Sequence, residues 1–373
     1  MNLLKVSFRA FLIIIAWIFI IPEVIAVQKK HETDSVKIGL LIPDNKSLAA
    51  CRGAEMAIRQ ANENGGFNGK PFKLVMRSME GPWGNGSKQA VNLIFEEKVC
   101  AIMGSHDGRN AHLVEQVTTK ARIVFLSAWA GDPTLSQAFV PWYFTCVPND
   151  LQQADALIEE IYNIRKFTRI AAVADSDYDS KLALTSFLKR TRIAGKADPL
   201  QFFYDNSDHD FNKIIDQIDR ADAEGIILFG RPPASQKLIQ QLRQRKMNQS
   251  LFGSLSLLDD DKLSDHDLKY YENVTLVSSG NFSGSKNLDF RHEFKRSYGI
   301  FPGFVAAYSF DGMSLLIEAI RIAGTDHDKI QKTLAKIHLE GVTGTIQFDD
   351  KGKRVGPVVL MEIKNGEPVI VER

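Results

Sequence analysis

Short apolar runs rich in branched residues alternate along the chain with segments whose apolar residues recur at helical spacing. The run at residues 36–42, VKIGLLI, is typical of a buried strand. In residues 52–64 three alanines and Ile58 recur at helical spacing, and Gly65 and Gly66 end this predicted helix. Together they form the first strand–helix pair of the chain.

Two series of such pairs are predicted. The first has strands at residues 36–42, 72–79, 100–103 and 123–127 and helices at 52–64, 88–97 and 111–120. The second begins near Pro148 and has strands at 169–174, 200–204, 225–229 and 251–254 and helices at 152–164, 181–192, 211–219 and 235–245. Strands and helices that alternate in this way form parallel sheets with helices on both faces. The pattern predicts an α/β protein with two similar lobes.

The last third of the chain is less regular. Its predicted helices are residues 289–298 and 306–323, and its predicted strands are 274–278, 345–348, 358–363 and 369–371. The polar turn at 349–352, DDKG, predicts a hairpin-like connection between the second and third of these strands. No low-complexity segment separates the two series, which predicts that the chain crosses between the lobes more than once.

The N-terminal segment is typical of a secretory signal peptide. Lys5 and Arg9 precede an unbroken apolar run at residues 10–21, and Pro22 and the small-residue pattern ending at Ala26 follow. The alternative is an uncleaved anchor, but a membrane span needs roughly 20 apolar residues. We therefore expect cleavage near Ala26, a signal peptide at 1–26, and a periplasmic or secreted mature protein.

Composition and charge exclude several classes of function. The 373 residues include 46 Lys and Arg and 45 Asp and Glu, for a net charge of +1. This near-neutral charge does not indicate that the protein binds nucleic acid.

Export permits disulfides among Cys51, Cys100 and Cys146, but an odd number of cysteines leaves at least one thiol free.

Signals for chemistry are weak. Residues 105–107 read Ser-His-Asp, but adjacent residues cannot converge as a hydrolase triad, and no G-x-S-x-G motif occurs. The glycine-rich stretch 81–88 ends in Ser87 then Lys88, which inverts the order that a nucleotide-binding loop requires. No H-E-x-x-H or paired C-x-x-C motif indicates a metal. We expect no catalytic residues, metal or cofactor.

The loops that follow the predicted strands are the candidate ligand site. In open parallel sheets, ligands bind beyond the carboxyl ends of the strands. Each loop could instead have ordinary turn chemistry, but all of them share one sheet edge. The candidates are Ser105, Asp107, Gly108 and Arg109 in the first loop, Trp129, Ala130, Gly131 and Asp132 in the second, and Tyr178, Arg231, Ser254 and Ser256 in the second series.

Several stretches resemble one known family. VKIGLLIP, RGAEMAIRQANENGGFNGKPFKLV, AIMGS, IVFLSAWAGDPTLS, DHDFNKIIDQI and GVTGTIQFDDKGK are similar in order and spacing to type I periplasmic binding proteins of the leucine/isoleucine/valine-binding kind, which feed ABC importers. The resemblance implies two doubly wound parallel-sheet lobes joined by a hinge of three crossovers, near 146–148, 278–281 and 354–357. Lobe 1 would be 36–147 plus 282–354, and lobe 2 would be 148–281 plus 355–373.

The resemblance also implies roles for the candidate loops. It places the contacts to a ligand carboxylate around residues 107–109 and a backbone contact at Ala130, and it makes Tyr178 the residue that packs over the ligand. Gly131 stands where the family usually has threonine, and Arg231 and Pro232 stand in the loop that usually bears a tyrosine.

The acidic residue that would pair with a ligand ammonium has no match, because the corresponding stretch is 254–256, Ser-Leu-Ser. A buried ammonium without a carboxylate partner carries a heavy desolvation cost. Two hypotheses remain. Asp107 or Asp132 replaces the missing acid, or the ligand lacks an ammonium and Arg109 or Arg231 binds a carboxylate.

The sequence thus favours a non-enzymatic, monomeric protein that captures an amino acid, amide or small carboxylate and delivers it to the permease of an ABC importer. A sensor subunit with the same fold, signalling to a membrane partner, and a secreted hydrolase are the alternatives. A cytoplasmic repressor is disfavoured, because the chain begins with an export signal and not with a helix-turn-helix.

Overall fold

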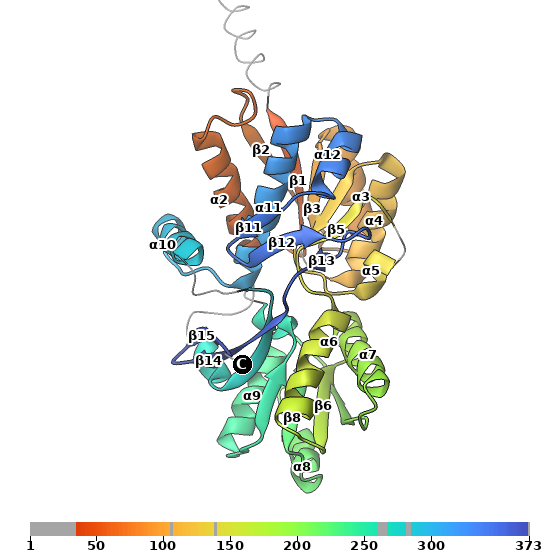
Figure 1. Ribbon diagram of the computed structural model, residues 1–373, viewed down its shortest axis with the longest axis vertical. Coiled ribbons are helices and arrows are strands. Elements are labelled where there is room, and N and C mark those ends of the chain that lie inside the picture. Colours follow the sequence, from red (N-terminus) through yellow and green to blue (C-terminus); the bar gives the residue numbers. More distant parts are fainter. Residues whose placement is uncertain (1–34, 105–106, 138–139, 260–266, 281–284, 372–373) are drawn as a thin grey trace, which may run out of the picture.

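The computed structural model describes residues 35–371 except for 105–106, 138–139, 260–266 and 281–284. Two α/β units lie one above the other, each built on its own sheet (Figure 1). The described chain passes between the units after β5, after β10 and after β13. Among the helices of the described residues, none is both long and apolar enough to cross a lipid bilayer.

The first sheet is parallel throughout, with strand order β2-β1-β3-β4-β5. Its strands are β1 (Val36–Ile42), β2 (Phe72–Ser78), β3 (Ala101–Gly104), β4 (Val124–Ser127) and β5 (Tyr143–Thr145). Alternate residues of β1 face opposite sides: Ile38 and Leu40 pack in one core, and Leu41 packs in the other. Helices therefore cover both faces, as the apolar runs predict.

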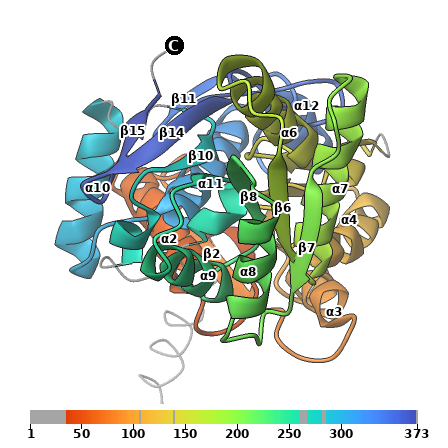
Figure 2. The same cartoon turned by 90° about the horizontal axis from the view of Figure 1, so that it is seen from below.

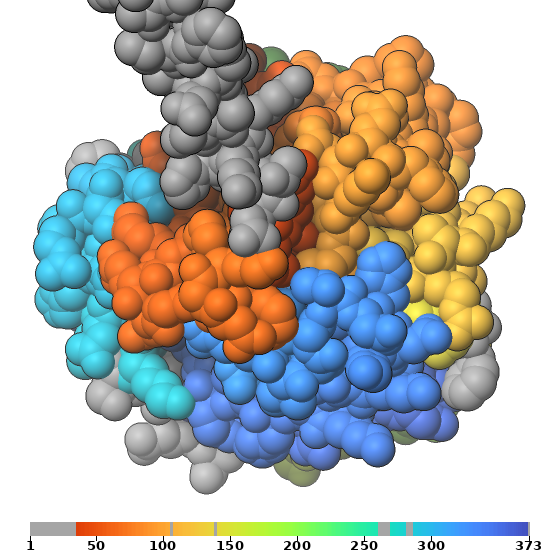
Figure 3. Space-filling view, turned by 90° about the horizontal axis from the view of Figure 1, so that it is seen from above, coloured from red at the N-terminus to blue at the C-terminus, as the bar shows by residue number. Residues whose placement is uncertain are grey.

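The helices of this unit come from both ends of the chain. They are α2 (Leu48–Glu63), α3 (Asn85–Val91), continued by a π-helical turn over Asn92–Glu96, α4 (Gly108–Ala121), α5 (Pro133–Gln137), α10 (Ser285–Tyr298), α11 (Phe304–Ala323) and α12 (His327–Leu334). Helices α2 and α11 pack on one face of the sheet, and α3 and α4 pack on the other. Seen from above, α10 lies beside α2 (Figure 3).

The second sheet has the order β15-β14-β10-β9-β8-β6-β7. Its strands are β6 (Ile170–Asp175), β7 (Leu200–Tyr204), β8 (Gly225–Phe229), β9 (Ser250–Gly253), β10 (Val274–Ser278), β14 (Val359–Lys364) and β15 (Glu367–Ile370). Only β14 and β15 run antiparallel to their neighbours.

Four α-helices cover the two faces of the second sheet. Helices α6 (Asp150–Ile158), continued by a π-helical segment over Glu159–Ile164, and α7 (Tyr178–Ile193) pack on one face, and α8 (Asn212–Arg220) and α9 (Ala234–Gln244) pack on the other. Viewed from below, these two pairs lie on opposite sides of the sheet (Figure 2). Two short 3₁₀ turns, Leu255–Leu258 and Asp267–Tyr271, lie in the connection between β9 and β10.

The predicted hairpin between residues 345–348 and 358–363 is wrong. Strands β11 (Leu339–Gly341), β12 (Gly344–Phe348) and β13 (Arg354–Val355) form a small separate sheet, and β12 pairs with β11 and β13. After β13 the chain turns at Gly356, whose φ of 137° favours glycine, and β14 joins the second sheet beside β10. Burial of Leu360 and Ile363 in that unit decides the pairing.

At the cleft, α4 and α7 each begin three residues earlier than their apolar pattern predicts, and this defines the edge of the cleft. Helix α4 starts at Gly108 because the carboxylate of Asp107 accepts a hydrogen bond from the Asn110 N–H at 2.7 Å. Helix α7 starts at Tyr178 because Asp177 accepts one from the Ser180 N–H at 2.7 Å. Candidate residues expected in loops therefore lie on the first turns of helices.

The three connections between the units meet at one buried guanidinium. Arg354, at the start of β13, donates to the carbonyl oxygens of Cys146 at 2.6 Å and Thr343 at 2.9 Å. The Thr343 carbonyl also accepts from the Ser279 hydroxyl, which follows β10, at 3.1 Å. Asp311 accepts the Thr343 hydroxyl at 2.6 Å, and although burial raises the pKa of this aspartate, Thr343, Val342 and Arg354 oppose the shift. One polar network thus joins every connection.

We expect Arg354→Met to destabilise the protein by about 3 kcal/mol, because buried carbonyls and Asp311 lose their cation while the side-chain length is kept. Urea unfolding measures the loss. Lys353→Met is the control, since its pair with Asp349 is partly exposed and worth about 1 kcal/mol at most. Equal losses in the two variants would contradict the role given to Arg354.

Candidate ligand-binding pocket

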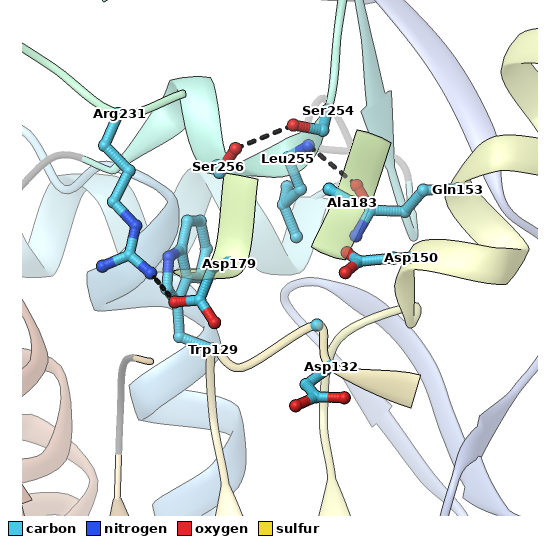
Figure 4. Close-up of a pocket in the computed structure, with 11 residues that line it drawn as sticks. Trp129, Asp132, Asp150, Gln153, Asp179, Ala183, Arg231, Ser254, Leu255 and Ser256 are labelled. Atoms are coloured by element: carbon cyan, nitrogen blue, oxygen red, sulfur yellow. Dashed lines mark hydrogen bonds and ion pairs between the residues drawn. The ribbon is translucent and has the colours of Figure 1, made fainter. Parts of the chain in front are cut away.

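A pocket lies between the two units, where the carboxyl ends of both sheets face each other (Figure 4). Its walls come from the loop after β4, the first turns of α6 and α7, and the loops after β8 and β9. The residues that line it are Trp129, Gly131, Asp132, Asp150, Gln153, Asp179, Ala183, Arg231, Ser254, Leu255 and Ser256. Both units therefore contribute to the lining of one pocket.

Half of the residues predicted from sequence line this pocket. They are Trp129, Gly131, Asp132, Arg231, Ser254 and Ser256. The lining does not include Asp107, Gly108, Arg109, Ala130 or Tyr178, although these lie next to it, and Ser105 lies outside the described residues. The sequence reasoning missed Asp150, Gln153, Asp179, Ala183 and Leu255.

The loop after β4 is held from inside the first unit. The ring of Trp129 is buried and meets the ring of Tyr308 edge to face, with the centroids 5.7 Å apart. The N–H of Ala130 donates to the Ser127 hydroxyl at 3.1 Å, and its carbonyl accepts from Thr145. These contacts fix one wall, and they use both backbone groups of Ala130 within the protein.

Asp132 is already saturated with donors. One carboxylate oxygen accepts from His112 at 3.0 Å and from the Tyr178 hydroxyl at 3.1 Å, and the other accepts from the Thr134 N–H and hydroxyl. Burial opposes ionisation of Asp132, but the bonds from His112 and Thr134 outweigh it and lower the pKa of the aspartate. Asp132 and protonated His112 form an ion pair within the first unit.

Asp179 connects three structural parts of the site. One of its oxygens accepts from the N–H of Gly108, the first residue of α4, at 2.9 Å, and the other pairs with Arg231. A side chain at Gly108 has no room, because a Cβ there would lie 2.8 Å from Asp132 Oδ2 and 3.0 Å from Asp179 Oδ1. Glycine therefore lets the Asp179 carboxylate reach the start of α4.

Asp150 lies at the start of α6, and its carboxylate faces the pocket without a hydrogen-bond partner among the described residues (Figure 4). Burial raises the pKa of Asp150 well above its usual value, and the nearby carboxylates of Asp179 and Asp132 raise it further. A Cβ on Gly131 would lie 2.7 Å from Asp150 Oδ1. Glycine at position 131 thus makes room for this acid.

Gln153 bridges the walls of the pocket. Its amide nitrogen donates to the Pro148 carbonyl at 2.9 Å, and its oxygen accepts from the Leu255 N–H at 2.9 Å. Asp150 and Gln153 are three positions apart and share one face of the first turn of α6. A capping box, Asn149 with Gln152, marks this helix start in the sequence and could have identified both residues.

Arg109 lies beside the pocket, between two aromatic rings. Its guanidinium carbon is 5.6 Å from the ring centroid of Trp83 and 5.6 Å from that of Tyr178, which belongs to the other unit. Asp107 uses both oxygens on Asn110. The alternatives that Arg109 binds a carboxylate and that Asp107 binds an ammonium therefore find no support in the geometry.

No group of three His, Cys, Asp or Glu residues in the described part of the chain is placed to hold a metal ion.

The hydroxyls of Ser254 and Ser256 lie 2.7 Å apart and hydrogen-bond each other. Cys51, Cys100 and Cys146 are all buried and form no disulfide bond with one another, and burial raises the pKa of Cys100 and of Cys146 to about 12.

Comparison with known proteins decides the family. The model of a family described as periplasmic binding protein matches residues 35–368. The chain belongs to the periplasmic binding protein family. This is a family of solute-binding proteins, and its description places them in the periplasm.

Relatives of this periplasmic binding protein have names related to amino acids. An amino acid binding protein of Pseudomonas aeruginosa is 23% identical over 344 residues, covering 89% of this chain and 91% of the relative. The Leu/Ile/Val-binding protein homolog 1 of Brucella melitensis is 22% identical over 316 residues, covering 83% and 84%.

Solved structures share the fold. The substrate-binding protein LivJ of a Streptococcus pneumoniae branched-chain amino acid transporter, in complex with isoleucine, has a TM-score of 0.80 at 20% identity and covers 90% of this chain and 99% of its own. An ABC transporter solute-binding protein of R. palustris, in complex with benzoate, has a TM-score of 0.79 at 16% identity, covering 90% and 95%. The predicted α/β class, with two mainly parallel sheets, is confirmed.

The His112–Asp132 pair predicts a pH-dependent stability. Its partners Asp132 and Glu115 raise the pKa of His112 from 6.5 to about 9, so its stabilising charge is fully present below pH 6.5 and is lost as pH rises through about 9. We expect His112→Gln to lose about 1 kcal/mol at neutral pH, a value discounted because the side chain is a third exposed, and to flatten this fall in stability.

Thermal unfolding of both proteins on either side of this pH window measures the effect. His338→Gln, which changes an exposed histidine paired with Glu340, is the control. A fall in melting temperature that is as steep in His112→Gln as in the unmodified protein would contradict the assignment.

Proposed function

We propose that this protein captures a small solute (an amino acid, an amide or a small carboxylate) between its two units and delivers it to an ABC importer. The observation that carries the proposal is the pocket between the carboxyl edges of both sheets, into which Asp150 presents a carboxylate that has no hydrogen-bond partner among the described residues. The isoleucine and benzoate complexes of the structural neighbours support ligands of this size.

Asp150 is the proposed partner of a ligand ammonium or amide N–H. Burial and the neighbouring carboxylates of Asp179 and Asp132 raise the pKa of Asp150, so they disfavour its ionised form. A cationic ligand group at this place relieves both penalties, because an opposite charge favours the ionised carboxylate. Asp150 thus supplies the acid that residues 254–256 lack, in place of Asp107 or Asp132.

The proposed mechanism is closure of two lobes about a hinge. Lobe 1 comprises residues 36–147 plus 282–354, lobe 2 comprises 148–281 plus 355–373, and the Arg354 network holds the three connections. Contacts across the cleft, such as Tyr178 with Asp132, favour the closed form, and a ligand that touches both lobes shifts the population toward it.

The remaining features follow from this proposal. The N-terminal segment would direct export and be cleaved near Ala26, and the mature monomer would dock on the permease of the importer. The protein would release its ligand unchanged, because Asp132, Asp179 and Arg231 are engaged in ion pairs and the Ser254 and Ser256 hydroxyls bond each other.

A thermal-shift screen of residues 27–373 with amino acids, amides and small carboxylates tests the proposal. A ligand at a hundred times its Kd stabilises the folded state by about 2.7 kcal/mol, which raises the melting temperature by about 2 °C or more. The protein is refolded beforehand to remove any co-purified ligand. Failure of every compound to raise the melting temperature, or chemical conversion of a bound compound, would overturn the proposal.

Asp150→Asn is expected to weaken the binding of an ammonium ligand about tenfold to a hundredfold, because a charge-assisted contact is lost. The unliganded variant should be at least as stable as the unmodified protein, since an unfavourable buried charge is removed. Calorimetric titration measures the affinity. Asp155→Asn, on the exposed side of the same helix, is the matched control and should bind normally.

A further inference from the structure

Asp179 occupies the place in the pocket where an anion would be best held. Its carboxylate accepts the N–H at the start of α4, where the helix dipole favours negative charge, and it pairs with the Arg231 guanidinium. Gly108 belongs to the first unit, and Asp179 and Arg231 belong to the second. A protein side chain thus makes the contacts across the cleft that a ligand carboxylate would otherwise make.

Two of the three carboxylates that line the pocket are in ion pairs. The described lining includes the carboxylates of Asp132, Asp150 and Asp179 and the guanidinium of Arg231. Asp132 pairs with His112, which also pairs with Glu115, and Asp179 pairs with Arg231. Among the described residues no ion pair involves Asp150, so a cationic group of a ligand would find its carboxylate partner there.

Resting on the proposed function, we propose that Asp179 is a built-in substitute for a ligand carboxylate, so that the pocket takes a solute with an ammonium group and no free carboxylate. A small amine or the amide of an amino acid has this chemistry. A zwitterionic amino acid would pair its ammonium with Asp150 but bring a second anion close to Asp179 and Asp132.

The packing around Asp179 also opposes a second carboxylate. The space over Gly108 is filled, since even a Cβ there would lie within 3.0 Å of Asp179 and closer to Asp132. Burial already raises the pKa of Asp179 to about 6 although Arg231 opposes the shift. Another anion would increase this penalty, whereas a cation would decrease it.

Matched pairs of compounds test the inference on the unmodified protein. Calorimetric titration compares alanine, leucine and phenylalanine, as free acids, with alaninamide, leucinamide and phenylalaninamide. We expect the amide of any pair that binds to bind at least about tenfold more tightly than its acid. Tighter binding of the free acid would overturn the inference while the proposed function stands. Binding of none of these compounds, nor of any solute in the wider screen, would remove both.

Asp179→Ala isolates the role of the carboxylate. The substitution vacates the anion position, so the preference for amides should disappear and acetate should raise the melting temperature of this variant more than that of the unmodified protein. Asp155→Asn removes an acidic charge at an exposed position and should keep the preference for amides. An acetate effect of the same size in Asp179→Ala and in the unmodified protein would also overturn the inference, as would an unchanged preference.

Discussion

The hydrogen bonds of one buried guanidinium hold together the three connections on which the position of both sheets depends. Arg354 donates to the carbonyls of Cys146, which follows β5, and of Thr343, which precedes β12. Ser279 and Asp311 complete the network through their bonds to Thr343. A buried cation is costly to leave without acceptors, so the three connections stay packed against one another. The carboxyl edges of the two sheets then face each other, and the loops and helix starts that line the pocket meet.

Within the pocket, charge balance plays the corresponding role. His112 neutralises Asp132, and Arg231 and the start of α4 hold Asp179. Two glycines make this possible, because Gly108 admits the Asp179 carboxylate and Gly131 admits that of Asp150. The absence of a side chain at these two positions therefore decides where the acids of the pocket can lie.

The apolar pattern predicted the bounds of four strands to the residue. Three of them, at residues 36–42, 225–229 and 274–278, are buried on both faces, and the fourth, at 200–204, is largely exposed. The hairpin after residue 348 was wrong, because a polar turn specifies a reversal but not which sheet the next strand joins. The starts of α4 and α7 were predicted three residues late, because caps and not apolar spacing set them.

The sequence by itself determined the α/β class, the two series of strands, and the sheet edge at which Trp129, Asp132, Arg231 and Ser254 lie, because these follow from short-range periodicity and from the polarity of parallel strands. Only the tertiary structure decided which of these side chains remain available to a ligand. Asp132, Asp179 and Arg231 are engaged by partners 20, 71 and 52 positions away, and Asp150 is left open because its neighbours find other partners. Pairing between side chains so far apart in the chain depends on distances between segments that no local pattern encodes.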